Sequence, residues 1–256
     1  MLLTIDIGNT NIVFGVYKNN EWLKHWRIKT DPLKTADEYA VIFRTLLHAG
    51  EISCAEVSEI IMSNVVPSLM HPFNEMLNGL FSQAKINTVA PAIYRHLPIK
   101  ILNPYEIGAD LVSNSVAAHH KYGDFTMVID FGTALTFTTI GAASEIKGAA
   151  IAPGLRTATG SLALKTAQLP QIHLTPPPSV LGENTIHAIQ SGIVFGYTGL
   201  VEAIIKKTEE ELNEKLTVVA TGGLSHVIAP LTKSIDAIES MLTLEGLALI
   251  AEFIPS

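Results

Sequence analysis

Runs of apolar residues alternate with polar turns at the start of this chain and predict short strands. Two turn pairs, Gly8-Asn9 and Asn19-Asn20, join three such runs, which cover residues 2–6, 11–17 and 21–30. Asparagine and glycine tolerate the positive φ values that tight hairpin turns require. The chain is therefore expected to open with three strands connected as hairpins.

The period of the apolar residues changes to that of a helix after Thr35. Apolar side chains then recur at spacings of three or four residues as far as Leu47, and Gly50 follows as a typical helix end. Thr35 and Glu38 have the spacing of a capping box, in which each side chain accepts a hydrogen bond from the other residue's backbone N–H group. This segment is predicted to be an amphipathic helix.

The rest of the chain continues to alternate between the two periods. Helices are expected over residues 68–81, 108–122, 156–164, 184–214 and 244–253. Strands are expected over residues 57–62, 125–130, 135–141, 145–152 and 216–220, with shorter ones near residue 89 and over 99–102. Four prolines between Leu169 and Pro178 predict a stiff extended connection. Strands that alternate with helices indicate an α/β fold.

One arrangement of residues occurs twice, once in each half of the chain. An apolar run leads into an aspartate, a small polar turn follows, and a second apolar run returns; the turns are Asp6-Ile7-Gly8-Asn9-Thr10 and Asp130-Phe131-Gly132-Thr133-Ala134. The order of features repeats, although the residues differ. We therefore expect two related lobes, residues 1–115 and 116–256, that face each other across a cleft. The helix over 108–122 would form the bridge between them.

Composition narrows the class of protein. The net charge of −7 argues against a nucleic-acid partner, because such proteins need a basic face to neutralise phosphates. A small anionic substrate remains compatible with a locally positive pocket. Cys54 is the only cysteine, which excludes an internal disulfide and fits a reducing compartment. No apolar stretch is expected to span a bilayer, so we predict a soluble cytoplasmic protein without a membrane partner.

The acidic turns suit a phosphate group and its cation. Asp6 can hold a cation directly or through water, Gly8 leaves room for the ligand, and backbone N–H groups can donate to phosphate oxygens together with the side chains of Asn9, Thr10 and Asn11. Asp130, Gly132 and Thr133 offer the same chemistry. A single turn of this kind is an ordinary hairpin turn. Two turns in matched contexts favour an ATP-using phosphotransferase.

Two further positions are candidates for chemistry. Gly222-Gly223 follows an apolar strand, where paired glycines let a flat ligand such as a nucleoside lie against the backbone; a plain strand-to-helix turn is the alternative. Asp110 is expected in the first turn of a helix, where the helix dipole favours the ionised carboxylate that a general base requires. Acidic residues at such positions are also common simply as stabilising charges. The chain has no P-loop, so a kinase of this sequence uses a different phosphate site.

Taken in order, these segments closely resemble type III pantothenate kinases, within the acetate kinase, sugar kinase, Hsp70 and actin superfamily. The resemblance covers essentially the whole chain. It rests on Asp6 to Asn11, Ser63-Asn64-Val65-Val66-Pro67, Asn103-Pro104, Gly108-Ala109-Asp110, Asp130 to Ala134, Ile151-Ala152-Pro153-Gly154, Thr185, Ser191-Gly192, Thr221-Gly222-Gly223 and Leu242-Thr243-Leu244-Glu245-Gly246.

The resemblance implies two ribonuclease H-like lobes in an actin-like duplication, and ATP-dependent phosphorylation of pantothenate to 4′-phosphopantothenate for coenzyme A synthesis. It implies that Asp6 to Asn11 hold the ATP phosphates, with Asp6 near magnesium. Asp110 would be the general base, and Asp130 would hold a monovalent cation, potassium or ammonium, beside Thr133. Thr185 would contact pantothenate near a homodimer interface.

One position departs from the family pattern. The family usually has arginine after Gly-Ala-Asp, whereas this chain has Leu111 after Gly108, Ala109 and Asp110. The missing guanidinium would have suited the carboxylate of pantothenate. Ile101 also stands where some members have a substrate-facing aromatic residue. Two alternatives therefore stay open: a kinase of the same superfamily with another hydroxyl substrate, and a diverged accessory or regulatory protein.

Overall fold

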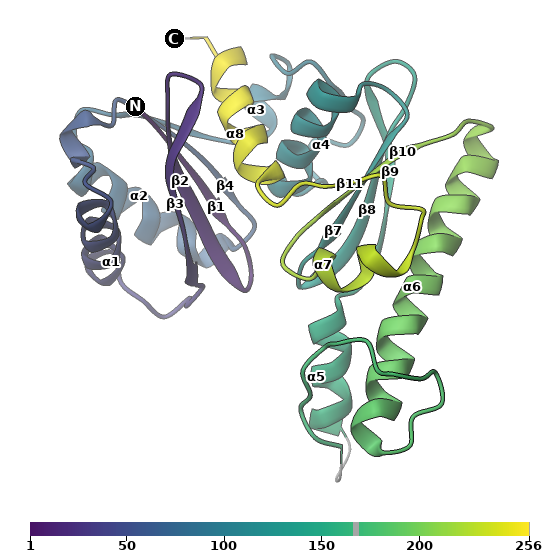
Figure 1. Cartoon of the computed structure of the whole chain (residues 1–256). Coiled ribbons are helices and arrows are strands. Elements are labelled where there is room, and N and C mark those ends of the chain that lie inside the picture. Colours follow the sequence, from purple (N-terminus) through teal and green to yellow (C-terminus); the bar gives the residue numbers. More distant parts are fainter. Residues whose placement is uncertain (166–168, 256) are drawn as a thin grey trace. The chain divides into compact units, whose positions relative to one another are not determined.

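The protein forms two compact units in a computed structural model that describes residues 1–165 and 169–255 (Figure 1). The first unit contains residues 1–117 and the C-terminal residues from 242 onward, and the second contains residues 118–241. The expected lobe boundary at 115/116 lies close to this division. The difference is at the C-terminus, where the last helix belongs with the first unit.

The first unit is built on a sheet with the strand order β3-β2-β1-β4-β5. The meander predicted from the opening apolar runs is present, and its strands pair antiparallel as hairpins. The later strands β4 and β5 add in parallel on the other side of β1. The bounds are β1 (Leu2–Ile7), β2 (Asn11–Lys18), β3 (Glu21–Lys29), β4 (Glu59–Asn64) and β5 (Lys85–Thr88).

Two helices cover one face of this sheet and form the first hydrophobic core. Helix α1 (Ala36–Ala49) begins with the predicted capping box of Thr35 and Glu38, and Gly50 ends it. Helix α2 (Met70–Leu80) packs beside α1 after a single 3₁₀ turn. Alternate residues of β1 and β2 enter this core because successive strand side chains point to opposite faces.

The connection after β5 differs from the sequence-based expectation. The strand expected near residue 89 lies earlier, as β5, and the chain then forms the short helix α3 (Pro91–Tyr94), which Pro91 starts at its first position. Proline is favoured there because the first helical N–H group has no partner inside the helix. Strand β6 (Lys100–Ile101) is shorter than the expected 99–102.

The second unit repeats the plan of the first. Its strands run in the order β9-β8-β7-β10-β11, again with antiparallel hairpins on one side and parallel strands on the other. The bounds are β7 (Thr126–Phe131), β8 (Ala134–Ile140), β9 (Glu145–Pro153), β10 (Thr217–Thr221) and β11 (Ala237–Ile238). The pattern of hydrophobic runs did not reveal β11, which has only two residues.

The duplication extends to individual positions. Asp6 and Asp130 are each the last residue but one of the first strand in their unit. Asp6 pairs in parallel register with Ser63 at the end of β4, and Asp130 pairs with Thr221 at the end of β10. Each aspartate therefore has a hydroxyl-bearing residue on the neighbouring parallel strand. The predicted repeat is a structural one.

Three helices accompany the second sheet. They are α5 (Leu155–Lys165), α6 (Thr185–Leu212) and the short α7 (Ser225–Ile228), and they contribute Leu155, Val194, Val201, Ile205 and Val227 to a second core with the sheet. The segment between α5 and α6 has no regular structure over residues 169–178, as its prolines predict. In Figure 1 the first turns of α6, in green, extend past the end of the sheet beside α5.

Helix α6 is long and apolar enough to cross a membrane by length and composition alone. The expectation that no apolar stretch of the chain is long enough to span a bilayer is therefore wrong for α6. The core helix of a soluble protein meets the same criterion, and α6 buries Val194 and Val201 completely in the second core.

Helices α4 (Ala109–Tyr122) and α8 (Leu242–Phe253) meet on the side of the first sheet that α1 and α2 leave free. Their backbones touch at Gly246, where an added Cβ would lie 1.9 Å from the carbonyl oxygen of Ser113. Beside this contact, the hydroxyl of Thr243 donates to Oδ1 of Asn114 at 2.8 Å. Only glycine permits two helices to approach so closely.

We expect Gly246→Ala to lower the stability of the protein. The added methyl group must displace a backbone carbonyl, and overpacking of this kind costs ~1–3 kcal/mol, more than the helix propensity gained. Thermal and denaturant unfolding measure the effect. Gly199→Ala on α6 is the matched control, since nothing lies within 4 Å of its added Cβ; it should be neutral or stabilising by up to ~1 kcal/mol. A Gly246→Ala protein as stable as the control would contradict the close crossing.

Candidate functional site

The first acidic turn is held in a fixed shape by its neighbours. The N–H group of Gly8 donates to the carbonyl of Asn11 at 3.1 Å, which closes the turn between β1 and β2. Thr30, just after β3, donates its hydroxyl to the Gly8 carbonyl at 2.6 Å and its N–H to the Thr10 carbonyl at 3.0 Å. Asn9 and Thr10 are exposed. The turn is rigid at its base and open at its tip, as an anion site requires.

Ser63 is part of this site and was absent from the predicted site residues. It lies directly beside Asp6 in the parallel register of β4 with β1, and its hydroxyl donates to Oδ1 of Asp6. This bond orients one carboxylate oxygen. The signal in the sequence was the position of Ser63 at the end of the second parallel strand, which has meaning only once the pairing of β1 with β4 is known.

A short series of contacts brings Asp110 to the same turn. The N–H group of Val65, just beyond β4, donates to the carbonyl of Ile7 at 3.1 Å. Gly108 packs against Val65, whose Cγ1 atom would lie 3.7 Å from a Cβ at Gly108. Helix α4 begins at the next residue, with Asp110 in its first turn. The structure thus joins Asp6, Gly8, Gly108 and Asp110 in one region of the first unit.

Burial raises the pKa of the Asp110 carboxyl above its usual range, although the N–H groups of Leu111 and of Asp110 itself donate to it and oppose the rise. The Leu111 N–H group lies 2.8 Å from Oδ1. Tyr94 has its pKa raised by burial and by the charge of Asp110. A carboxylate with a raised pKa is a stronger base toward a hydroxyl group.

Gly108 leaves room for the carboxylate of Asp110. A Cβ at Gly108 would lie 2.4 Å from Oδ1 of Asp110, so a larger residue would displace the carboxylate. Ala109 is buried. Leu111 adds no charge, and the segment 108–111 therefore presents one carboxylate and no cation.

The second acidic turn is assembled with the glycine pair of β10. Gly222 has φ of +86°, in the region that favours glycine, and a Cβ there would lie 2.5 Å from Oδ1 of Asp130. A Cβ at Gly132 would lie 3.5 Å from the same oxygen. Gly223 follows and is exposed. The structure therefore brings together Asp130, Gly132, Gly222 and Gly223, which are far apart in sequence.

Thr133 connects this turn to helix α5. Its carbonyl accepts hydrogen bonds from the N–H of Gly154 at 3.0 Å and from the hydroxyl of Thr157 at 2.6 Å. A Cβ at Gly154 would lie 2.3 Å from the carbonyl oxygen of Gly132, so glycine is required there. The role of Gly154 is thus to let α5 start directly against the turn.

Thr185 lies apart from the second turn, at the first residue of α6. It is exposed, and Asn184 before it caps the helix by accepting the N–H of His187 at 2.9 Å. The segment before α6 is tied to it, since the Ser191 hydroxyl donates to the Val180 carbonyl. Large apolar side chains near this end of α6 are exposed: Leu164, Val180, Leu181 and Ile186.

The donor groups fit a magnesium ion that is held mainly by phosphates. In the described ranges, 1–165 and 169–255, no three His, Cys, Asp or Glu residues form a group able to hold a metal ion. Asp6 and Asp130 each offer a single carboxylate at a turn with backbone N–H groups. Magnesium typically binds one or two carboxylates together with substrate phosphates and water.

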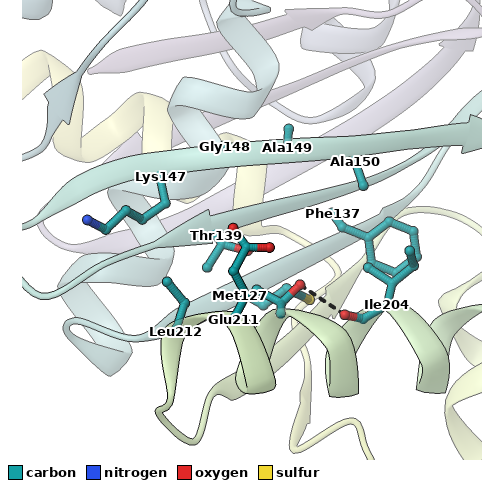
Figure 2. A pocket seen from close by; sticks show the side chains of 11 residues that line it. Met127, Phe137, Thr139, Lys147, Gly148, Ala149, Ala150, Ile204, Glu211 and Leu212 are labelled. Atoms are coloured by element: carbon teal, nitrogen blue, oxygen red, sulfur yellow. Dashed lines mark hydrogen bonds between the residues drawn. The ribbon is translucent and has the colours of Figure 1, made fainter.

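A cavity of about 240 Å³ lies elsewhere in the second unit (Figure 2). It opens between β8, β9 and the C-terminal half of α6, with an apolar floor that includes Met127 and Phe137 and with Lys147 and Glu211 at its edge. None of the predicted site residues lines it.

Comparison with known proteins gives a consistent result. The sequence profile described as type III pantothenate kinase matches residues 2–207. The type III pantothenate kinase of Moorella thermoacetica is 42% identical over 252 residues, which cover 98% of this chain and 99% of that protein. The protein of the same name from Citrifermentans bemidjiense is 41% identical over 250 residues, which cover 98% of each.

Solved structures show the fold. A protein from Sinorhizobium meliloti named as a 2-dehydro-3-deoxygalactonokinase has a TM-score of 0.60 at 12% identity, with 99% of this chain and 97% of that chain covered. A protein from Campylobacter jejuni named as a Baf family transcriptional activator has a TM-score of 0.58 at 17% identity, with 98% and 97% covered. The expected fold, an actin-like duplication of ribonuclease H-like lobes, is confirmed.

We expect Asp110→Asn to be more stable than the wild type at pH 7 in the absence of ligands. Because the folded pKa of Asp110 is raised, the folded protein holds this proton to higher pH than the unfolded chain does. Stability therefore falls as pH rises through that window, and the loss is complete above the folded pKa. Asparagine does not ionise, so the variant avoids this loss of stability. Its higher stability relative to the wild type should be present at neutral pH and vanish below the ordinary aspartate pKa of ~3.9.

Thermal unfolding as a function of pH measures this difference. Asp37→Asn is the matched control, since Asp37 also lies in a first helical turn but is exposed. Loss of its favourable interaction with the helix dipole should reduce stability by ~0.3–1 kcal/mol, the opposite sign. A loss of stability in Asp110→Asn at pH 7 would contradict a raised pKa.

Proposed function

This chain belongs to the type III pantothenate kinase family, and we propose that it transfers the γ-phosphoryl group of ATP to the primary hydroxyl of pantothenate, with Asp110 as the general base. The product would be 4′-phosphopantothenate, the first intermediate of coenzyme A biosynthesis. The observation that supports Asp110 most directly is its place beside the first acidic turn, through Val65 and Gly108. A soluble kinase of this kind would act in the cytoplasm.

Asp110 would accept the proton of the substrate hydroxyl as the hydroxyl oxygen forms its bond to the γ-phosphorus. The bond from that phosphorus to the β-phosphate oxygen breaks, and ADP leaves. Positioning and charge neutralisation supply most of the catalysis in such phosphoryl transfers. The raised pKa of Asp110 supports the role, because a stronger base takes up the proton more readily.

The first turn would bind ATP phosphates through Gly8, Asn9, Thr10 and Asn11. Asp6 would hold magnesium, in part through water, and the bond from Ser63 would keep its carboxylate in place. When bound, magnesium neutralises charge on the phosphates. We assign Gly132, Thr133, Gly222 and Gly223 to further contacts with the nucleotide, since the glycines leave the backbone of that turn accessible.

Asp130 would hold a monovalent cation, potassium or ammonium. Its support is chemical: Asp130 offers a single carboxylate, whose one negative charge matches the charge of a monovalent cation. The contact of Gly222 with Oδ1 of Asp130 fixes the carboxylate. Thr133 lies next to this position.

We further propose that the protein is a homodimer and that Thr185 contacts pantothenate near the interface. Leu181 and Leu164 are 83% and 85% exposed in one chain, which is unusual for leucine. Both lie at the same end of α5 and α6 as Thr185. An exposed apolar surface of this kind is typical of a subunit interface.

ADP release with candidate acceptors tests the proposed reaction. We expect turnover with pantothenate, no turnover with sugars or polyols, and stimulation by potassium or ammonium that Asp130→Asn abolishes. Asp110→Asn should lose at least ~100-fold in kcat, a typical contribution of general-base catalysis, while it binds ATP normally. Activity with sugars alone would establish another kinase, and no activity with any acceptor would favour an accessory role. Turnover of Asp110→Asn at the wild-type rate would exclude Asp110 as the base.

The homodimer is tested by sedimentation velocity. The wild type should sediment as twice the mass of one 27.6 kDa chain, and Leu181→Asp should shift it toward the monomer because a charge cannot be buried unpaired at the interface. Leu33→Asp is the control, since Leu33 is 91% exposed in the other unit. A monomeric wild type would contradict the proposal.

A further inference from the structure

We infer that the cavity in the second unit binds a small organic ammonium ion, with its apolar body between the sheet and α6 and its charged group at Glu211 and Thr139 (Figure 2). This site takes no part in the proposed phosphoryl transfer, and the inference does not depend on that reaction. Three properties of the molecule support it: the way in which the cavity is formed, a hydroxyl group inside it that has no partner, and the negative charge at its edge.

The cavity exists because β9 contributes small residues to a face on which its neighbours contribute large ones. Met127 on β7, Thr139 on β8 and Gly148 on β9 form one row across the sheet. In the next row along this face, Phe137 pairs with Ala150. An added Cβ at Gly148 would meet no atom of residues 1–165 and 169–255 within 4 Å. The space beside β9 is therefore open to a ligand.

Helix α6 lines the other side of the cavity with one stripe of residues. Ile204, Thr208, Glu211 and Leu212 have the spacing that places side chains on one face of a helix. The volume of about 240 Å³ lies below the ~300–1,000 Å³ of sites for drug-sized molecules. Because a water molecule occupies ~30 Å³ in the liquid, the ligand should have roughly eight to ten non-hydrogen atoms.

The hydroxyl group of Thr139 supplies a polar contact inside the cavity. Thr139 lines the cavity and is only 5% exposed. Its hydroxyl has no hydrogen-bond partner within the described part of the chain. Thr136 and Thr138 on β8 also have hydroxyls without partners, but alternation along the strand places them on the opposite face of the sheet. A buried hydroxyl without a hydrogen bond is unfavourable, and a polar group of a ligand would satisfy it.

The edge of the cavity carries negative charge that is not compensated. Lys147 pairs with Glu145 at 2.6 Å, so the charges of these two residues offset each other. The Glu211 carboxylate has no hydrogen-bond or ion-pair partner within residues 1–165 and 169–255, whereas Glu210 pairs with Lys206. Figure 2 shows the Glu211 side chain pointing from α6 toward the sheet. A carboxylate in this position favours a cationic ligand.

The end of α6 adds to this preference. Glu211 lies in the last turn of the helix, and α6 ends at Leu212 beside the cavity. The carbonyl groups at a helix C-terminus give it a partial negative charge, which favours cations near the last turn. An ammonium group can donate hydrogen bonds both to the Glu211 carboxylate and to the Thr139 oxygen. The apolar part of the ligand then contacts Phe137 and Ile204.

A ligand in this cavity leaves the second acidic turn free. Met127 and Asp130 are three residues apart on β7, which is roughly 10 Å along the strand. Their side chains lie on opposite faces of the sheet, since Met127 belongs to the second core and successive residues alternate. The ammonium ion and a nucleotide at Asp130 can therefore be bound at the same time.

Methyl NMR of the whole protein with 2-phenylethylammonium tests the inference. We expect saturable shifts of the Met127 and Ile204 methyl resonances, with a dissociation constant of about 1 mM or lower, and no shift of Met62 in the first unit. Excess ATP should not displace the probe. 2-Phenylethanol has the same shape without the charge and should bind ~2- to 5-fold more weakly. Phenylacetate, which carries the opposite charge, should show no saturable binding.

Substitutions around the cavity separate its contributions. Glu211→Gln should weaken binding of the ammonium ion ~2- to 5-fold and leave 2-phenylethanol unchanged, because only the charged ligand loses an interaction. Thr139→Val keeps the shape of the side chain but removes the hydroxyl, and should weaken binding ~2- to 10-fold. Ala150→Leu should abolish binding, since the larger side chain fills the cavity. Glu210→Gln is the matched control, because Glu210 pairs with Lys206, and should bind as the wild type does.

Three results would overturn the inference. They are equal affinities for the ammonium ion, the alcohol and the acid, an absence of saturable shifts at Met127 and Ile204, and undiminished binding by Ala150→Leu. Because Glu211→Gln and Thr139→Val change few atoms, they keep the inference testable if Ala150→Leu does not fold. Binding is measured without an acceptor substrate, so each result leaves the proposed phosphoryl transfer unaffected.

Discussion

The parallel pairing of β1 with β4 is the constraint on which the first unit's site depends. It places Ser63 beside Asp6 and lets the N–H of Val65 reach the Ile7 carbonyl. Val65 in turn packs against Gly108, where α4 begins. The carboxylate of Asp110 is thus positioned by backbone hydrogen bonds and packing. Groups held in this way lose little conformational freedom when a substrate binds. Such preorganisation lowers the barrier in an enzyme whose catalysis depends mainly on the orientation of its groups.

The second unit uses the same pairing for a different purpose. Its β7 and β10 align Asp130 with Thr221, but the next residue is Gly222, whose backbone packs directly on the Asp130 carboxylate. In the first unit the Ser63 hydroxyl donates to the Asp6 carboxylate, and the residue after Ser63 is Asn64, not glycine. One topology therefore produces two unequal acidic sites, and the difference lies in the residue that follows the hydroxyl-bearing neighbour on the parallel strand.

Activity and stability compete at Asp110. A half-buried carboxylate with a raised pKa makes the folded protein less stable at neutral pH, and the same property strengthens it as a base. The crossing of α4 with α8 compensates in part, because the contact at Gly246 and the bond from Thr243 to Asn114 anchor the helix that carries this residue.

The sequence by itself determined the strands and helices, the repeat of the acidic turns, and the family. These follow from local periodicity, turn residues and short motifs, such as the capping box of Thr35. Only the tertiary structure decided that the last helix joins the first unit, that Ser63 orients Asp6, and that Gly222 contacts Asp130. It also brought Thr139 and Glu211 to one cavity. The physical reason is that parallel strand pairing and helix crossings join residues far apart in the chain, and no local pattern encodes the register between them.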